Sequence, residues 1–318
     1  MRKYKKKDKI LIFGVSGQDG SILAKEYLKN KFEVYGVFTS GRKNYKNLKK
    51  LGINKKIKIL NLKNNTVDKI IVKTNCKKIF FFSGVASVTQ SDFNKNISIK
   101  SNNELLIEIL EVIRNRNLKN IKILNASSSE IFGKNYFMNI EESELNPVSY
   151  YGVAKSISTE IVRAYRLQFK IKVFNAILFN HESPLRPKDY VIKKIIHNVK
   201  QIHLKKSSKI KLGNLEVSRD WGWATEYVNI MKKIINLNTA DDFIICTGHN
   251  YKLREVVNLV FSHYNLNYKN YVYQSKNLLR LYEVKKISGS NKKLFKTINY
   301  KPKIFMKEIL SRMINNQF

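Results

Sequence analysis

The chain has 318 residues, of which 43% are hydrophobic and 26% are charged. This composition supplies enough apolar material for a buried core and excludes a wholly disordered chain. The formal net charge of +36, from 60 Lys and Arg against 24 Asp and Glu, is a feature that nucleic-acid-binding proteins share. Because the lysines recur in nearly every segment, we interpret this charge as compositional bias and predict no specific nucleic acid as a partner.

The chain begins with a basic segment that does not predict an export signal. After it, residues 10–13 form a short apolar run that ends in a glycine turn, as expected for a first strand. Since no apolar run approaches the roughly 18 residues of a membrane-spanning helix, we expect no membrane partner and a cytoplasmic location. Cys76 and Cys246 lie far apart and the five histidines are scattered, so we predict neither a disulfide nor a metal site.

The first half of the chain alternates strand-like and helix-like patterns. Short apolar runs, rich in β-branched and aromatic residues, are followed by stretches in which apolar residues have helical spacing. This alternation predicts an α/β fold of the Rossmann type, a doubly wound parallel sheet with crossover helices. The expected strands are Ile10–Phe13, Glu33–Phe38, Ile57–Leu60, Ile79–Phe82, Ile121–Leu124 and Ile171–Leu178, and the clearest helices are Ser21–Asn30, Glu104–Arg114 and Lys155–Phe169.

After about Asn180 this alternation ends. An irregular stretch with two prolines is followed by a helix at 191–204 and, later, by a strand at 243–247 that we expect to return to the main sheet. The change predicts a second, smaller lobe built from separate pieces of the chain. The predicted division is a Rossmann domain over residues 1–180, with return segments near 220–262, and a discontinuous substrate-binding lobe within 181–318.

A glycine-rich turn lies between the first expected strand and the first expected helix. Its glycines are Gly14, Gly17 and Gly20, and Gln18 and Asp19 lie between the last two. Glycines permit the tight turn and let the backbone approach a pyrophosphate, which then lies on the helix N-terminus. The turn therefore predicts a dinucleotide-cofactor site.

The residues after the second strand bear on which cofactor is used. An NAD site usually has an Asp or Glu here, which binds the ribose hydroxyls. This chain has no acid at that point and has Arg42 and Lys43 instead, whose charges suit the 2′-phosphate of NADP. We therefore predict NADP, with NAD as the alternative.

Four side chains that suit the oxidation of a sugar are Ser128, Glu130, Tyr151 and Lys155. Tyr151 and Lys155 are four residues apart and share one helix face, so the ammonium can favour the ionised phenol. Such a phenol can take a proton from a sugar hydroxyl while a nicotinamide takes the hydride. Glu130 adds an acid–base group that a simple alcohol dehydrogenase does not need.

Several segments, in order along the chain, resemble one family. They include Gln18-Asp19-Gly20, Asn180-His181-Glu182-Ser-Pro, Arg219-Asp220-Trp221-Gly222 and Arg280-Leu-Tyr-Glu283. Over nearly its whole length the chain resembles the GDP-mannose 4,6-dehydratases, which belong to the extended short-chain dehydrogenase/reductases. The resemblance implies a lyase that converts GDP-mannose to GDP-4-keto-6-deoxymannose by internal hydride transfer and water elimination.

The resemblance also implies roles for single residues. Ser128 stands where the family has a threonine that hydrogen-bonds the sugar 4-hydroxyl, and Glu130 matches the acid–base carboxylate. Tyr151 matches the phenolate base and Lys155 its partner. The implied cofactor-binding residues are Gly14, Gly17, Gln18, Asp19, Gly20, Arg42, Asn61, Tyr151, Lys155 and His181, and the implied substrate-binding residues are Ser87, Asn180, Glu182, Lys194, Gly213, Arg219, Arg280 and Glu283.

The chain departs from the family pattern near the cofactor, where a double arginine is replaced by Thr39-Ser40. This departure keeps open NAD as well as NADP, and a homodimer as well as a homotetramer. One alternative function is that of a dehydratase, reductase or epimerase acting on another GDP-linked sugar, such as a GDP-heptose. Another is a binding protein on the same fold, against which the retention of all four catalytic residue types argues.

Overall fold

The computed structural model describes residues 8–38, 44–84, 95–135, 137–275, 278 and 282–318. The described residues form two compact units, each made of separate stretches of the chain. The first unit comprises Met1–Ile131, Ser149–Ile177 and Val228–Phe243, and the second comprises Phe132–Val148, Leu178–Tyr227 and Ile244–Phe318. The division at residue 180 that the sequence suggested stays a prediction about domain organisation.

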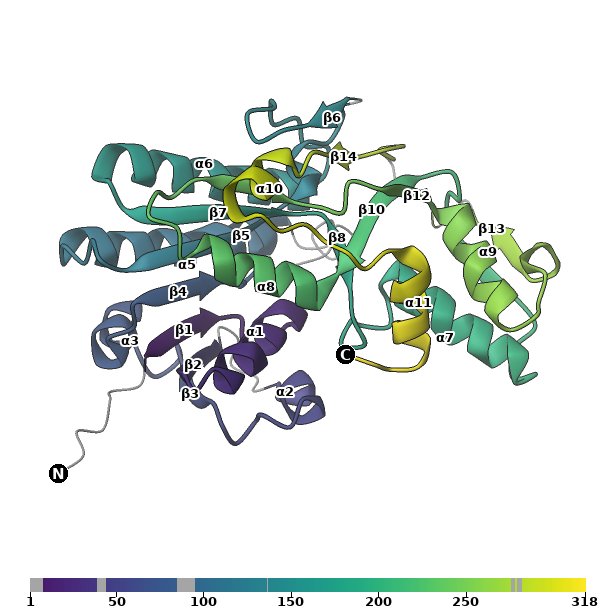
Figure 1. Cartoon of the computed structure of the whole chain (residues 1–318), viewed down its shortest axis with the longest axis horizontal. Helices are drawn as coiled ribbons and strands as arrows, with labels where there is room; N and C mark the ends of the chain where they lie inside the picture. The colour runs from purple at the N-terminus through teal and green to yellow at the C-terminus, as the bar shows by residue number, and fades with distance from the viewer. Residues whose placement is uncertain (1–7, 39–43, 85–94, 136, 276–277, 279–281) are drawn as a thin grey trace. The chain divides into compact units, whose positions relative to one another are not determined.

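The first unit is built on a seven-stranded sheet with the strand order β11-β7-β5-β4-β1-β2-β3 (Figure 1). The pairs β1–β2, β2–β3, β1–β4 and β4–β5 are parallel. The order reverses direction at β1, and in open α/β sheets ligands bind at the carboxyl ends of the strands beside such a point. The strands are β1 (Lys9–Phe13), β2 (Glu33–Phe38), β3 (Lys58–Asn61), β4 (Lys78–Phe81), β5 (Lys122–Ser128), β7 (Lys172–Leu178) and β11 (Asp242–Ile245).

Helices cover this sheet and account for its apolar strands. Residues Ile10 to Phe13 of β1 are all fully buried, as expected for a strand with helices on both faces. One core cluster joins β1, β2, β4, β5 and β7 to three of the helices, α3, α5 and α6. The helices of this unit are α1 (Gln18–Lys29), α2 (Lys46–Lys50), α3 (Val67–Thr74), α5 (Lys95–Asn115) and α6 (Tyr150–Phe169), and a 3-10 turn, η1, spans Ser129–Ile131.

The Rossmann-type sheet predicted from the sequence is confirmed, and β11 is the expected late strand that returns to it. Several elements differ in extent from the prediction, and helix α5, for example, begins at Lys95 and not at Glu104. Strand β5 continues to Ser128, because its polar residues find hydrogen-bond partners inside the unit. Helix α6 begins at Tyr150, not at Lys155, because the Ser149 hydroxyl accepts a hydrogen bond from the Gly152 N–H and caps the first turn.

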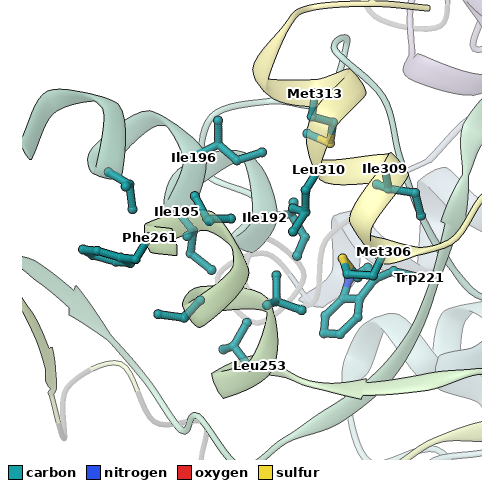
Figure 2. Packing of buried hydrophobic residues seen from close by; sticks show 14 of the residues in the cluster. Ile192, Ile195, Ile196, Trp221, Leu253, Phe261, Met306, Ile309, Leu310 and Met313 are labelled. Atoms are coloured by element: carbon teal, nitrogen blue, oxygen red, sulfur yellow. The ribbon is translucent and has the colours of Figure 1, made fainter. Parts of the chain in front are cut away.

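The second unit has a helical core and three small sheets. Its main cluster packs apolar side chains of α7 (Val191–His203), α9 (Leu253–His263) and α11 (Met306–Ile314) around Trp221 and Trp223. Figure 2 shows these side chains pointing from the three helices into one common interior. The sheets are β12-β10-β8, β13-β9 and β14-β6. Their strands are β6 (Met138–Asn139), β8 (Asn180–Glu182), β9 (Ile210–Leu212), β10 (Ser218–Trp223), β12 (Asn250–Lys252), β13 (Val272–Gln274) and β14 (Ser288–Gly289), and the remaining helices are η2 (Tyr268–Asn270) and α10 (Lys292–Ile298). Helix α8 (Ala224–Ile234) begins in the second unit and continues into the first from Val228 on.

Candidate active site

The glycine turn between β1 and α1 has a backbone that only glycine allows at two of its positions. Gly14 has φ +80°, and a Cβ there would lie 2.8 Å from the Phe82 carbonyl carbon. A Cβ on Gly20 would lie 2.4 Å from the Gly14 oxygen. Both contacts are with backbone, which cannot move aside, so α1 starts as close to β1 as the chain permits.

Gly17 differs from these two glycines because a Cβ there would meet no atom closer than an ordinary contact. It is the N-cap of α1, with φ −68°, and a Cβ there would lie 3.4 Å from the Gly14 oxygen, an ordinary contact. Without a side chain, the N-cap leaves the start of the helix open to an anion, and the helix dipole favours one there. The turn therefore fits the pyrophosphate of a dinucleotide.

Alanine substitutions separate these two roles of glycine. We expect Gly20→Ala to destabilise the protein by about 1–3 kcal/mol, because the added methyl overpacks the turn. We expect Gly17→Ala to change the free energy of unfolding by less than about 1 kcal/mol, while the cofactor dissociation constant rises at least about tenfold because the methyl occupies the phosphate's approach. Urea titration and calorimetric titration with NADP and NAD measure the two effects. Equal cofactor affinity in Gly17→Ala and the wild type would contradict this position for the pyrophosphate.

Another predicted cofactor residue of this unit, Asn61, lies at the end of a neighbouring strand. Asn61 is the last residue of β3, paired in register with Phe38 of β2. Its side-chain oxygen accepts a hydrogen bond from the Lys63 N–H at 2.9 Å, which fixes the turn after the strand. Arg42, like the substrate-binding candidates Ser87 and Arg280, lies outside the residues that the structure describes.

Strand β5 and the turn that follows it carry two of the four catalytic candidates. Ser128 ends the strand and is largely buried, and its hydroxyl accepts a hydrogen bond from the Glu130 N–H at 3.3 Å. Glu130 is half-buried in η1. Because η1 packs against α6, the structure brings the carboxylate-bearing turn to the helix that holds the other two candidates.

Helix α6 carries Tyr151 in its first turn and Lys155 one turn later. Lys155 is buried, and its ammonium donates a hydrogen bond to the Ala126 carbonyl of β5 at 2.9 Å. Burial lowers the pKa of Lys155 to about 8, since a charge loses hydration in the interior. At neutral pH the group is therefore still mostly protonated, as a partner for a phenolate must be.

Burial of the Lys155 ammonium predicts the direction in which the stability of the fold changes with pH. Below pH 8 both the folded and the unfolded chain protonate Lys155, and burying the charge opposes folding. Between a folded pKa of about 8 and the ordinary value of 10.5, the unfolded chain binds more protons, so stability rises with pH. We expect the wild type to gain about 3 kcal/mol over this range relative to Lys155→Met, in which the other titrating groups are retained. Urea unfolding of both proteins at pH 7 to 10.5 measures the difference, and a constant difference would contradict the assignment.

Four predicted residues of the second unit lie on two paired strands. Asn180 and Glu182 are the first and last residues of β8, and β8 runs parallel to β10, which carries Arg219. His181, between them, stacks on Tyr227 with ring centroids 4.8 Å apart, and its Nδ1 lies 2.7 Å from the Phe179 carbonyl oxygen. These two strands thus collect one predicted cofactor residue and three predicted substrate residues.

Charged groups of the second unit are drawn together near Arg219. Its guanidinium lies 3.9 Å from the Glu283 carboxylate, so the structure pairs two residues that were predicted to bind the substrate. The next residue, Asp220, accepts hydrogen bonds from the N–H and hydroxyl of Thr247 and from the Gly248 N–H. Burial nevertheless raises the pKa of Asp220 to about 6. These bonds fasten the strand that presents Arg219.

The other substrate candidates of the second unit lie on β8, on α7 and after β9. Burial raises the pKa of the Glu182 carboxyl, and an Arg186 nitrogen lies 3.5 Å from it. Lys194 lies in the first turn of α7, half-buried. Gly213 follows β9, where a Cβ would lie 2.7 Å from the Leu278 oxygen. A close backbone approach therefore accounts for this glycine.

Polar residues inside the sheet are a feature that the sequence interpretation missed. Asn125 of β5 donates to Asn175 of β7 at 2.9 Å, and Asn175 donates to Asp242 at 2.9 Å. On the same strand as Asn125, the Ser127 hydroxyl lies 2.6 Å from that of Thr159 in α6. The available signal was a polar residue within an apolar strand run, since a buried polar group needs a partner.

The described part of the chain lacks two features of other protein classes. Within it, no helix is at once long enough and apolar enough to cross a membrane. The same residues contain no group of three or more His, Cys, Asp or Glu that could hold a metal ion.

The sequence and the fold of this chain are similar to those of known proteins. A family model described as GDP-mannose 4,6 dehydratase matches residues 11–313. The chain is 31% identical over 339 residues to the GDP-mannose 4,6 dehydratase of Homo sapiens, covering 96% of this chain and 90% of that one. Its fold is similar to dTDP-glucose 4,6-dehydratase from Bacillus anthracis in complex with NAD, with a TM-score of 0.83, 16% identity and coverage of 97% and 96%.

A second structural neighbour carries the other nicotinamide cofactor. It is RMD from Pseudomonas aeruginosa complexed with NADPH, with a TM-score of 0.79, 17% identity and coverage of 97% of this chain and 98% of that one. At such identities the two structures establish the fold alone. The family match extends over nearly the whole chain, and the chain therefore belongs to the GDP-mannose 4,6-dehydratase family.

Proposed function

We propose that this protein is a nucleotide-sugar lyase that converts GDP-mannose to GDP-4-keto-6-deoxymannose and water. Membership of the family supports the reaction. The observation that carries the proposal is the junction of β5, η1 and α6, where Lys155 binds the Ala126 carbonyl and the Glu130-bearing turn packs on the helix of Tyr151. A phenol, an ammonium and a carboxylate are the groups that the reaction needs.

In the proposed steps, Tyr151 and Glu130 each remove one proton from the sugar. Tyr151 removes the proton of the C4 hydroxyl, which Ser128 orients by a hydrogen bond. The C4 ketone acidifies C5, so Glu130 removes the C5 proton, and hydroxide leaves C6 with that proton as water. A nicotinamide cofactor held at the glycine turn of Gly14, Gly17 and Gly20 would supply the hydride chemistry, accepting hydride from C4 and giving it back at C6. C5 then takes a proton from solvent, and Tyr151 gives the C4 hydroxyl proton up to solvent, so the atoms of the substrate equal those of the product plus water.

We propose NADP as the cofactor, with Arg42 and Lys43 on its 2′-phosphate and Gly14, Gly17 and Gly20 around its pyrophosphate. The support is the sequence after β2, which has basic residues where an NAD site has an acid. Titration with both cofactors tests this choice. Tighter binding of NAD than of NADP would reverse it.

For the substrate, we propose that Arg219 and Arg280 bind the diphosphate and that Glu283 accepts hydrogen bonds from guanine. Guanidinium groups suit phosphate oxygens because their donors match two oxygens at once. We further propose a homodimer or homotetramer in the cytoplasm, in keeping with the family resemblance. Light scattering of the purified protein measures the assembly.

The direct test is incubation of the purified protein with GDP-mannose and a catalytic amount of cofactor, without added reductant. We expect a product lighter than the substrate by one water and carrying a carbonyl at C4. A product of unchanged mass would indicate an epimerase, and a requirement for stoichiometric reduced cofactor would indicate a reductase. Turnover of a GDP-heptose but not of GDP-mannose would assign the chain to another GDP-linked sugar.

A further inference from the structure

A closed circuit of bonds in the first unit begins and ends at Lys155. The Lys155 ammonium donates to the Ala126 carbonyl at 2.9 Å, and Ser127 follows Ala126 in β5. The Ser127 hydroxyl lies 2.6 Å from the Thr159 hydroxyl, and Thr159 donates to the Lys155 carbonyl at 2.8 Å. The Lys155 side chain thus bonds directly to Ala126 of β5. Its backbone carbonyl is connected to the next residue of that strand, Ser127, through the Thr159 hydroxyl.

The direction of each bond in the circuit follows from proton counting. A hydroxyl has one proton to donate, and that of Thr159 goes to the Lys155 carbonyl. The Ser127 hydroxyl must therefore donate to Thr159. Ser127 is 3% exposed and Thr159 is fully buried, so water does not compete for either group. The Ser127 and Thr159 hydroxyl protons consequently each have one defined acceptor.

We propose that Ser127 and Thr159 are positioning residues, which hold α6 against β5 so that the Lys155 ammonium stays at the Ala126 carbonyl, one helical turn from Tyr151. This proposal rests on the proposed function of Lys155 as partner of the phenol. Strand β5 also presents Ser128, the residue after Ser127. The same hydrogen bond therefore sets the register between the residue that orients the sugar hydroxyl and the helix that carries the base.

The pKa of Lys155 depends on its surroundings, so measuring it shows whether this register is kept. On α6 the nearest titratable group in sequence is Tyr151, and η1, which packs on the helix, carries Glu130. Helix α5 also packs on α6 and brings Glu111 to Tyr165, more than two helical turns beyond Lys155. Burial at β5 is thus the main influence on the pKa of Lys155, and a loosened junction admits water and raises it.

Ser158 provides a matched control for Thr159. Its hydroxyl is fully buried in the same turn of α6 and also donates to the Lys155 carbonyl, at 2.9 Å. The two hydroxyls differ in the bond from Ser127 to Thr159. Thr159→Val removes that bond with little change in volume, Thr159→Ser keeps it, and Ser158→Ala removes the control hydroxyl.

The first readout needs neither substrate nor cofactor. In protein labelled with ¹³C at the lysine Cε, the Lys155 signal is assigned by its loss in Lys155→Met and is followed with pH. We expect Thr159→Val to raise the Lys155 pKa by at least about one unit, and Thr159→Ser and Ser158→Ala to leave it near the wild-type value. An unchanged pKa in Thr159→Val would overturn the proposal, whatever the protein does with GDP-mannose.

The second readout separates positioning from support of the fold. In Thr159→Val we expect kcat for GDP-mannose to fall about 10- to 100-fold with KM within about twofold, because the reacting groups lose their alignment. The double variant Ser127→Ala/Thr159→Val leaves neither hydroxyl unpaired and should recover stability, yet should keep the low kcat and the raised Lys155 pKa. Recovery of kcat together with stability would show a merely structural pair. Absence of turnover in the wild type would contradict the proposed function while leaving the pKa test intact.

Discussion

Replacing Glu130 by glutamine is expected to lower kcat for GDP-mannose by about 10²–10⁴-fold. Glutamine has nearly the same shape but cannot take the C5 proton, and without that step water does not leave C6. The fold should tolerate the change because the Glu130 contact that we describe is made by its backbone N–H, to the Ser128 hydroxyl. The measurements are steady-state turnover, urea unfolding and cofactor affinity of the variant beside the wild type.

This variant should also stop the reaction at a recognisable stage. Oxidation at C4 depends on Tyr151, Ser128 and Lys155, which remain, so the ultraviolet absorbance of the reduced cofactor should rise and persist after substrate is added. The wild type should return to its starting absorbance. Near-normal turnover by Glu130→Gln, or loss of cofactor binding together with activity, would refute the role of the carboxylate in elimination.

Tyr151→Phe is the second change with a large expected effect. It removes the group that takes the C4 hydroxyl proton, so we expect kcat to fall by about 10²–10⁴-fold. The phenyl ring keeps most of the packing of the half-buried side chain, and KM should change by less than the turnover does. Unlike Glu130→Gln, this variant should fail to reduce the cofactor when substrate is added.

The neighbouring tyrosine supplies the control for that experiment. Tyr150 begins the same helix, is 41% exposed, and has the Lys95 ammonium 4.7 Å from its ring centroid. Tyr150→Phe makes the same chemical change one residue away, and it keeps the ring that the lysine contacts. We expect its turnover to stay within a few-fold of the wild type. Equal losses of turnover in Tyr150→Phe and Tyr151→Phe would mean that the loss comes from disturbing the start of the helix and not from removing the Tyr151 phenol.

Much of the sheet unit could be predicted because its strands bury both faces and therefore appear as apolar runs. Strand β2 has the predicted bounds, Glu33–Phe38, and β11 joins the sheet as expected. Strand β10 is not among the elements that the sequence predicted. It contains Arg219 and Asp220, whose partners lie far along the chain, and local sequence carries no signal of such contacts.

The candidate site shows the same limit at the level of single side chains. The elements of Tyr151 and Lys155 were predictable because their spacing implies one helix face. The circuit through Ser127 and Thr159 was not, because hydroxyls also occur at caps and turns and no pattern pairs residues across 32 positions. Burial of Lys155 likewise depends on tertiary packing, and it was found only in the structure.

In the proposed reaction, hydride leaves C4 and returns to C6 of the same sugar while water is lost. GDP-mannose labelled with deuterium at C4, incubated with the protein and unlabelled cofactor, tests it by mass spectrometry and NMR of the product. Internal hydride transfer predicts a product that has lost one water and carries the deuterium at C6. Deuterium found in the cofactor pool or in solvent, with an unlabelled C6, would contradict it.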